Sequence, residues 1–194
     1  MEKSKRINVE KLTTSAILIA LAMVLSLIKV YKLPLGGSVT LMSMLPVCML
    51  SLKYGTKWGF VCSFLYAAVQ LCNDLGEVMS WGMDVRMWIG CIVFDYLLAY
   101  GILGLSGIFR NKKTPVMLTG VGIAVFIRFV SHFISGSIFF DIWMPEEFDN
   151  PFLYSLVYNG SYMLPELIFT LIGAGVLFGV PVIRKLVKAE KNFT

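Results

Sequence analysis

Long apolar blocks separated by short polar stretches run along most of the chain. This alternation is typical of helical membrane proteins, and a block of about 20 residues can span a bilayer as a helix. We therefore predict an all-α membrane protein, a bundle of about six transmembrane helices. The six blocks are Leu12–Val30, Val39–Leu52, Trp58–Leu71, Met87–Phe109, Val116–Phe140 and Phe152–Ile183.

The second and third blocks are short, and Pro46 lies inside the second. They are either thin spans or a re-entrant pair. The segment Tyr31–Thr40 combines Pro34 with Gly36–Gly37 and predicts a turn. The loops Cys72–Arg86 and Asp141–Pro151 are the longest, and nothing resembles an interdomain linker. We expect residues 1–194 to form a single integral-membrane domain.

Charged residues alternate between the two sides of the predicted bundle. Acidic residues gather in the loops of one side: Asp74, Glu77, Asp84, Asp141, Glu146, Glu147 and Asp149. Basic residues gather on the other side: Lys3, Lys5, Arg6, Lys11, Lys53, Lys57, Arg110, Lys112, Lys113, Arg184, Lys185, Lys188 and Lys191. Because cytoplasmic loops carry the excess of Lys and Arg, both termini should be cytoplasmic. The net charge of +5 thus reflects membrane topology, and no basic face with interleaved aromatics indicates nucleic-acid binding.

Three blocks carry a polar residue deep in apolar sequence: Asp95, His132 and Asn159. Each lies eight residues from the outer end of its block, at a depth of roughly 12 Å for a rise of ~1.5 Å per residue. Ionisable groups inside a membrane usually face a cavity or a partner, and they mark functional sites. The shared depth predicts a single pocket near the outer surface.

Aromatic residues lie at the same depth or just above it: Tyr96, Phe140, Trp143, Tyr154 and Tyr158. They predict a pocket wall for a flat cation. The alternative is an interfacial aromatic belt, which suits Trp143 and Trp81 well. Arg128 leaves a second alternative open, because a structural Asp95–Arg128 ion pair would satisfy both charges without a ligand. Glu166 is open to a similar interpretation as a structural charge facing a cavity.

Several kinds of chemistry find no support in the sequence. His132 is the only histidine, which excludes a multi-histidine metal site, so no metal or cofactor is expected. Neither a phosphate-binding loop nor a hydrolase motif is present, and we expect no enzyme activity. The four cysteines, at positions 48, 62, 72 and 91, have no metal-ligand spacing and are interpreted as small buried hydrophobic residues.

Four segments of the chain resemble the thiamine-specific family of energy-coupling factor transporters, and in particular its substrate-binding subunit, the S component. They are LPLGGSVTLMSMLP, FDYLLAYGILGLSG, RFVSHFISGSIFF and LYSLVYNGSYMLPE, beginning at residues 33, 94, 128 and 153. The resemblance implies a six-helix bundle in a bacterial plasma membrane that binds thiamine near its outer face. It also implies as partners a transmembrane coupling subunit and two cytoplasmic ATPases, which supply the ATP hydrolysis.

The resemblance also assigns roles to individual residues. It places the family's binding acid at Asp95, the neighbouring tyrosine at Tyr96 and the histidine at His132. The last-helix tyrosine and asparagine fall on Tyr154 and Asn159. A stacking tryptophan of the family aligns with Phe140, with Trp143 three residues further on, so the main stacking ring stays open. Ala16 and Ala20 resemble the Ala-x-x-x-Ala motif that docks on the coupling subunit.

Two alternatives to thiamine capture are kept. One is an S component for another vitamin or for a thiamine precursor. The other, from a different class, is a membrane enzyme or sensor that uses Asp95 and His132 as acid–base groups.

Overall fold

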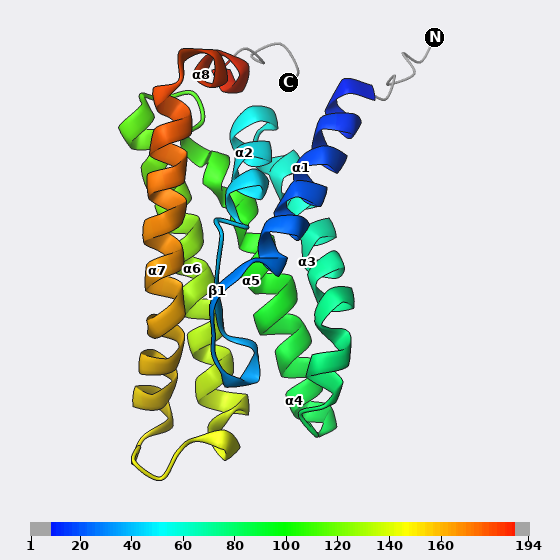
Figure 1. The fold of residues 1–194 in the computed structure, drawn as a ribbon, viewed down its shortest axis with the longest axis vertical. Helices are drawn as coiled ribbons and strands as arrows, with labels where there is room; N and C mark the ends of the chain where they lie inside the picture. The colour runs from blue at the N-terminus through cyan, green and yellow to red at the C-terminus, as the bar shows by residue number, and fades with distance from the viewer. Residues whose placement is uncertain (1–8, 189–194) are drawn as a thin grey trace.

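The computed structural model describes residues 9–188, which form a bundle of helices with one short β-hairpin (Figure 1). This confirms the predicted fold class. The α-helices are α1 (Val9–Leu27), α2 (Leu45–Tyr54), α3 (Thr56–Met79), α4 (Val85–Gly90), α5 (Ala99–Gly101), α6 (Thr114–Phe139), α7 (Pro151–Gly179) and α8 (Pro181–Lys188). The hairpin is β1 (Lys29–Lys32) and β2 (Ser38–Thr40), and η1 (Pro34–Gly36) and η4 (Asp141–Trp143) are single 3₁₀ turns.

Four segments are long and apolar enough to cross a membrane: α1, the stretch Val85–Phe109, α6 and α7. The other two predicted blocks deviate from plain spans. The second block divides into strand β2, a turn and the ten-residue helix α2, in which Pro46 occupies the first turn. Proline is accepted there because the first helical N–H groups have no intrahelical partner. The third block is longer than predicted, since α3 has 24 residues and includes Cys72–Met79, a segment that hydropathy assigns to a loop.

The start of α1 and helix α8 lie at one end of the bundle, together with the α2–α3 connection (Figure 1). The hairpin and the α6–α7 connection extend toward the opposite end. This arrangement agrees with the two-sided distribution of charge in the sequence. Of the residues used for that argument, Lys3, Lys5, Arg6 and Lys191 lie outside the described residues.

The stretch Val85–Phe109 is one continuous helical segment, and part of it is wound as a π-helix. Asp84 caps its start, because its Oδ1 accepts a hydrogen bond from the Met87 N–H at 2.8 Å. Helix α4 then passes into the π-helical segment η2 (Cys91–Leu98), α5 and the 3₁₀ segment η3 (Ile102–Phe109). π-Helical turns are rare and often occur at functional sites. Here the turn contains Asp95.

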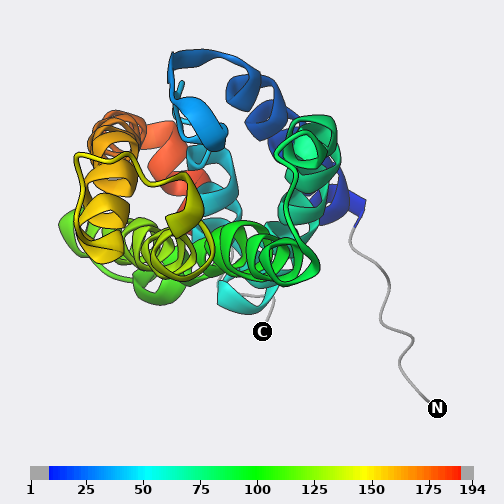
Figure 2. The ribbon, with the colours of Figure 1, turned by 90° about the horizontal axis from the view of Figure 1, so that it is seen from below.

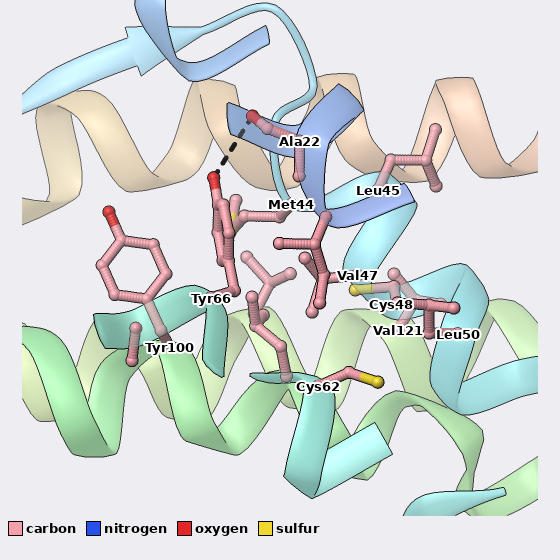
Figure 3. Close-up of a cluster of buried hydrophobic side chains, with 14 of the residues drawn as sticks. Ala22, Met44, Leu45, Val47, Cys48, Leu50, Cys62, Tyr66, Tyr100 and Val121 are labelled. Atoms are coloured by element: carbon pink, nitrogen blue, oxygen red, sulfur yellow. Dashed lines mark hydrogen bonds between the residues drawn. The ribbon is translucent and has the colours of Figure 1, made fainter. Parts of the chain in front are cut away.

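The hydrophobic core lies between α2, α3, α5 and α6, where apolar side chains from these helices interdigitate (Figure 3). Val47, Leu50 and Val121 are fully buried. Tyr66 is also fully buried, and its hydroxyl donates to the carbonyl of Ala22 at 3.4 Å, so its one polar group is satisfied. Three of the cysteines are buried as expected, but Cys72 is exposed on α3.

Helix α1 uses only one face for this packing. Ser15, Ile19, Ala22 and Ser26 are buried at helical spacing, whereas Ala16 and Ala20 are exposed on the other side. Its exposed neighbours Ile17, Leu21 and Val24 are apolar. The outer face of α1 is therefore apolar and carries two small residues one turn apart.

Small residues bring α2 and η3 into close contact at the opposite end of the bundle from the hairpin. The Ser51 hydroxyl donates to the carbonyl of Gly104 at 2.5 Å and accepts from the N–H of Gly107 at 3.0 Å. A Cβ atom on Gly107 would lie 2.2 Å from the backbone oxygen of Ser51. Backbone cannot move aside as easily as a side chain, so this contact depends on glycine.

We therefore expect Gly107→Ala to destabilise the protein by about 1–3 kcal/mol, the usual cost of overpacking a core. Gly175→Ala on α7 is the matched control, since a Cβ atom there would have no other atom within 4 Å. Alanine is the better helix former, and this control should keep or slightly raise stability. Thermal unfolding in detergent measures both variants, and an equal melting temperature for Gly107→Ala and wild type would contradict the packing argument.

Candidate functional site

A large cavity opens at the hairpin end of the bundle, between α3, η2, α6, α7 and the hairpin. Figure 2 looks onto this end, where the helices and the hairpin surround the centre of the molecule. The empty volume is about 1140 Å³ when its open mouth is included. Concave sites lined by aromatic residues and a few polar groups are typical of small-molecule binding pockets.

Asp95 is the centre of a hydrogen-bonded cluster on one wall of the cavity. Its Oδ1 lies 2.8 Å from Nδ1 of His132, and its Oδ2 accepts from the Ser135 hydroxyl at 2.5 Å. Both partners stand on α6, one turn apart, and so they reach the same carboxylate. The π-helical turn is supported from the same helix, since the Ser131 hydroxyl donates to the carbonyl of Phe94 at 2.6 Å. The carboxylate is thus held in one orientation before any ligand arrives.

Asn159 joins this cluster from α7. Its Nδ2 donates to the carbonyl of His132 at 3.3 Å and to that of Ser155 at 3.0 Å, while its Oδ1 accepts from the Tyr162 hydroxyl at 2.7 Å. Gly136 permits this approach of α6 and α7, because a Cβ there would lie 2.4 Å from the Ser155 hydroxyl. The structure thus brings together the three intramembrane polar residues that the sequence placed at a common depth.

Arg128 makes no ion pair with Asp95, although the sequence left that pairing open. Within the described residues, Asp95 contacts His132 and Ser135 by hydrogen bonds, and no salt bridge joins it to Arg128. Arg128 instead lies over the ring of Tyr100, with its guanidinium carbon 3.9 Å from the ring centroid. Its Nε and Nη1 atoms are buried and have no partner among the described residues. A structural Asp95–Arg128 pair therefore does not explain the intramembrane carboxylate.

The predicted aromatic wall is largely present. Tyr96, Phe140, Tyr154 and Tyr158 line the cavity, as do Asp95, His132 and Asn159. Trp143 does not line it, and its ring instead packs against Phe140 with centroids 5.4 Å apart.

Trp81, which the sequence assigns to an interfacial belt, does line the cavity and meets Phe140 edge-on at 6.2 Å. Position along the chain placed Trp81 in a loop. Because α3 extends to Met79, Trp81 follows directly after the helix and lines the cavity.

Sequence reasoning missed a polar stripe on α3. Gln70, Asn73, Asp74 and Glu77 follow helical spacing and line the cavity from α3, whereas Asp95 lines it from η2. The Tyr96 hydroxyl donates to Asp74 at 3.3 Å, which links the two walls. The i, i+3, i+4, i+7 spacing was visible in the sequence. Hydropathy alone ends this helix at Leu71, which places three of the four residues in a loop.

The charge lining the cavity is mainly negative. Asp74, Glu77, Asp95 and Glu166 contribute four carboxyl groups, against the two basic residues Lys29 and Arg128. An enclosed site with this excess of acidic groups favours a cationic molecule, since fields are stronger where water is excluded.

Residues 12–183 match the thiamine transporter protein (Thia_YuaJ) family. The chain belongs to this family. It is 31% identical to the thiamine transporter ThiT of Bacillus subtilis, and the alignment covers 98% of this chain and 100% of that protein. It is also 26% identical to the thiamine transporter ThiT of Lacticaseibacillus paracasei, over 53% of this chain and 56% of that protein.

A solved structure of ThiT from Listeria monocytogenes has the same fold, with a TM-score of 0.69. The match covers 91% of this chain and 97% of the other at 18% sequence identity. The chain is thus a multi-pass membrane protein of a transporter family with bacterial members, and the family is one of transport proteins and not of enzymes. The alternative of a membrane enzyme is set aside on this ground.

In this thiamine transporter family member, the hairpin lines the cavity, and Tyr158 of α7 is hydrogen-bonded to it. The Tyr158 hydroxyl accepts from the N–H of Gly37 at 3.1 Å and donates to the carbonyl of Pro34. A Cβ on Gly37 would lie 2.7 Å from that hydroxyl oxygen, so a larger residue there would displace the Tyr158 side chain. A salt bridge between Lys32 and Glu77, 3.0 Å long, connects the other side of the hairpin to α3.

We expect Tyr158→Phe to loosen the hairpin, because it removes both bonds and leaves the ring in place. Amide hydrogen exchange at Gly37 should be at least tenfold faster in the variant. Tyr154→Phe is the matched control, since the Tyr154 hydroxyl makes no hydrogen bond within the described residues, and it should leave exchange unchanged. Equal exchange at Gly37 in the wild type and in Tyr158→Phe would show that other contacts hold the hairpin.

Proposed function

We propose that the chain is the thiamine-binding subunit, or S component, of an energy-coupling factor transporter. In this role it captures thiamine from the outer side of the membrane in the cavity described above. Transport then depends on a transmembrane coupling subunit and two cytoplasmic ATPases, because the sequence has no nucleotide-binding motif of its own.

The observation that carries the proposal is the Asp95–His132–Ser135 cluster inside an aromatic cavity with an excess of negative charge. Thiamine has a permanently cationic thiazolium ring and a flat aminopyrimidine ring. A desolvated cation requires a counter-charge, which Asp95 supplies, and flat rings gain most from aromatic neighbours.

His132 adds a directional contact. With Nδ1–H donating to the Asp95 carboxylate, the neutral ring presents the lone pair of Nε2, which is buried and has no partner among the described residues. A ligand amine that donates to Nε2 would satisfy it, and the aminopyrimidine of thiamine carries such an amine. Asn159 holds the backbone of His132 from α7 and so fixes the ring in this position.

The stacking surface that we propose consists of Phe140 and Trp81, with Tyr96, Tyr154 and Tyr158 completing the wall. Phe140 and Trp81 both line the cavity, and their rings meet edge-on. Trp143 would act indirectly by supporting Phe140. An S component for another vitamin or for a thiamine precursor is the remaining alternative, and a titration with a panel of vitamins separates it from thiamine binding.

Docking is proposed on the outer face of α1. Ala16 and Ala20 are exposed there, and small residues four apart allow another transmembrane helix to approach closely. This face is separate from the cavity, which α1 lines only through Ser26 on its buried side.

We expect Asp95→Asn to weaken thiamine binding at least tenfold, about 1.4 kcal/mol, because the thiazolium charge loses its counter-ion. The variant should stay folded, since asparagine keeps one oxygen for Ser135. Quenching of tryptophan fluorescence by thiamine measures the affinity.

The control for Asp95→Asn is Asp141→Asn, an exposed outer carboxylate that does not line the cavity. It should bind thiamine as the wild type does. Wild-type affinity in a well-folded Asp95→Asn variant would refute the role of Asp95.

We expect Ala16→Trp or Ala20→Trp to leave thiamine binding by the isolated subunit intact and to abolish ATP-driven uptake by the full complex. A bulky ring on this face would hold the partner helix away without touching the cavity. Val176→Trp, on the exposed face of α7, is the control and should support uptake. Binding and uptake lost together would show that the alanines serve internal packing.

A further inference from the structure

The floor of the cavity contains two buried polar groups that the proposed thiamine contacts do not use. Arg128 lies one helical turn inward of His132 on α6, and Glu166 lies one turn inward of Tyr162 on α7. Both line the cavity, and both are more than nine-tenths buried. Neither forms a salt bridge within the part of the chain that the structure describes.

Each residue is held firmly on one side and left unsatisfied on the other. The guanidinium of Arg128 lies over the ring of Tyr100, but its Nε and Nη1 have no partner among residues 9–188. Oε1 of Glu166 accepts from the hydroxyl of Thr40 at 2.6 Å and from the N–H of the same residue, but its Oε2 has no partner in that range. Leaving buried donors and acceptors unpaired costs free energy, so such groups usually have a partner.

The two unsatisfied groups have opposite requirements. Arg128 can only donate hydrogen bonds, and the free oxygen of Glu166 needs a donor. A phosphate would accept from Arg128 but would offer Glu166 no proton and would be repelled by its charge. A neutral group that accepts on one side and donates on the other matches both.

We propose that Arg128 and Glu166 form a polar subsite on the cavity floor that binds a neutral ligand group carrying both a hydrogen-bond donor and an acceptor. The assignment rests on the proposed function. In thiamine the amine of the aminopyrimidine is assigned to His132, and the remaining group of this chemistry is the hydroxyl of the hydroxyethyl arm. A site built around such a group rejects analogues that lack it more strongly than a purely apolar pocket does.

The same geometry connects the subsite to the hairpin. Thr40 ends β2, and its contact with Glu166 places the end of the hairpin on the cavity floor. Glu166→Gln is therefore an informative substitution, because an amide oxygen can still accept from Thr40. The substitution keeps the Thr40 contact, removes the negative charge and turns the unsatisfied acceptor into a donor.

The test measures three ligands by tryptophan fluorescence on the full-length protein. They are thiamine, an analogue with an ethyl group in place of the hydroxyethyl group, and an analogue without the pyrimidine amine. We expect Glu166→Gln to weaken thiamine binding at least tenfold. It should weaken binding of the ethyl analogue, which lacks the hydroxyl, less than threefold, and binding of the analogue without the amine as much as binding of thiamine.

Thr170→Val is the matched control. Thr170 is buried one turn further along α7, its hydroxyl has no hydrogen-bond partner among the described residues and it does not line the cavity, so thiamine affinity should not change. Arg128→Lys is the second test variant, to be used if Glu166→Gln does not fold. It keeps the charge but loses the planar fork on Tyr100, and it should weaken thiamine binding at least fivefold.

Three results would overturn the subsite. They are unchanged thiamine affinity in a folded Glu166→Gln variant, an equal loss for all three ligands, and tighter binding of thiamine monophosphate than of thiamine. An equal loss would show that Glu166 acts only as a charge on the whole cation. A wild-type protein that binds none of the ligands would instead refute the proposed function, and the subsite assignment with it.

Discussion

The architecture around the cavity depends on keeping the Asp95 carboxylate charged and correctly oriented inside a membrane protein. A carboxylate removed from water is costly unless it is hydrogen-bonded and faces a partner charge. The protein meets the first requirement with His132 and Ser135 of α6. It leaves the second to whatever enters the cavity, since Arg128 is turned toward Tyr100. The site is thereby complementary to a cation before binding.

That requirement divides the bundle into two regions with different packing. Away from the cavity, Gly104 and Gly107 press against neighbouring helices so closely that no side chain fits between them. At the cavity end a hairpin lies beside the helices, and strand β2 precedes the short helix α2 in the second crossing. At the cavity end, His132 and Ser135 already hold the Asp95 carboxylate by hydrogen bonds. Preorganisation of this kind lowers the conformational entropy lost on binding.

The sequence predicted the fold class and the clustering of Asp95, His132 and Asn159, because intramembrane polar residues are rare enough to be conspicuous. It did not predict where α3 ends, since Asn73, Asp74 and Glu77 look like loop residues when hydropathy alone is read. In the structure they line the cavity from a helix that continues past the apolar block. The same error placed Trp81 in a belt. The orientation of Arg128 was unpredictable as well, because spacing gives depth but does not give the direction of a long side chain.

The buried groups without partners among the described residues define what a ligand of this cavity must offer. His132 Nε2 presents an acceptor beside Asp95, while Arg128 and Glu166 present a donor and an acceptor on the floor. Together they call for a molecule with a cationic ring in the middle and polar groups that both donate and accept at its ends. An apolar cation such as a simple quaternary amine would satisfy Asp95 but would leave the other three groups unpaired. The free-energy cost of those unpaired groups therefore makes the cavity selective against such cations. Attraction to the positive charge alone would not distinguish them from the ligand.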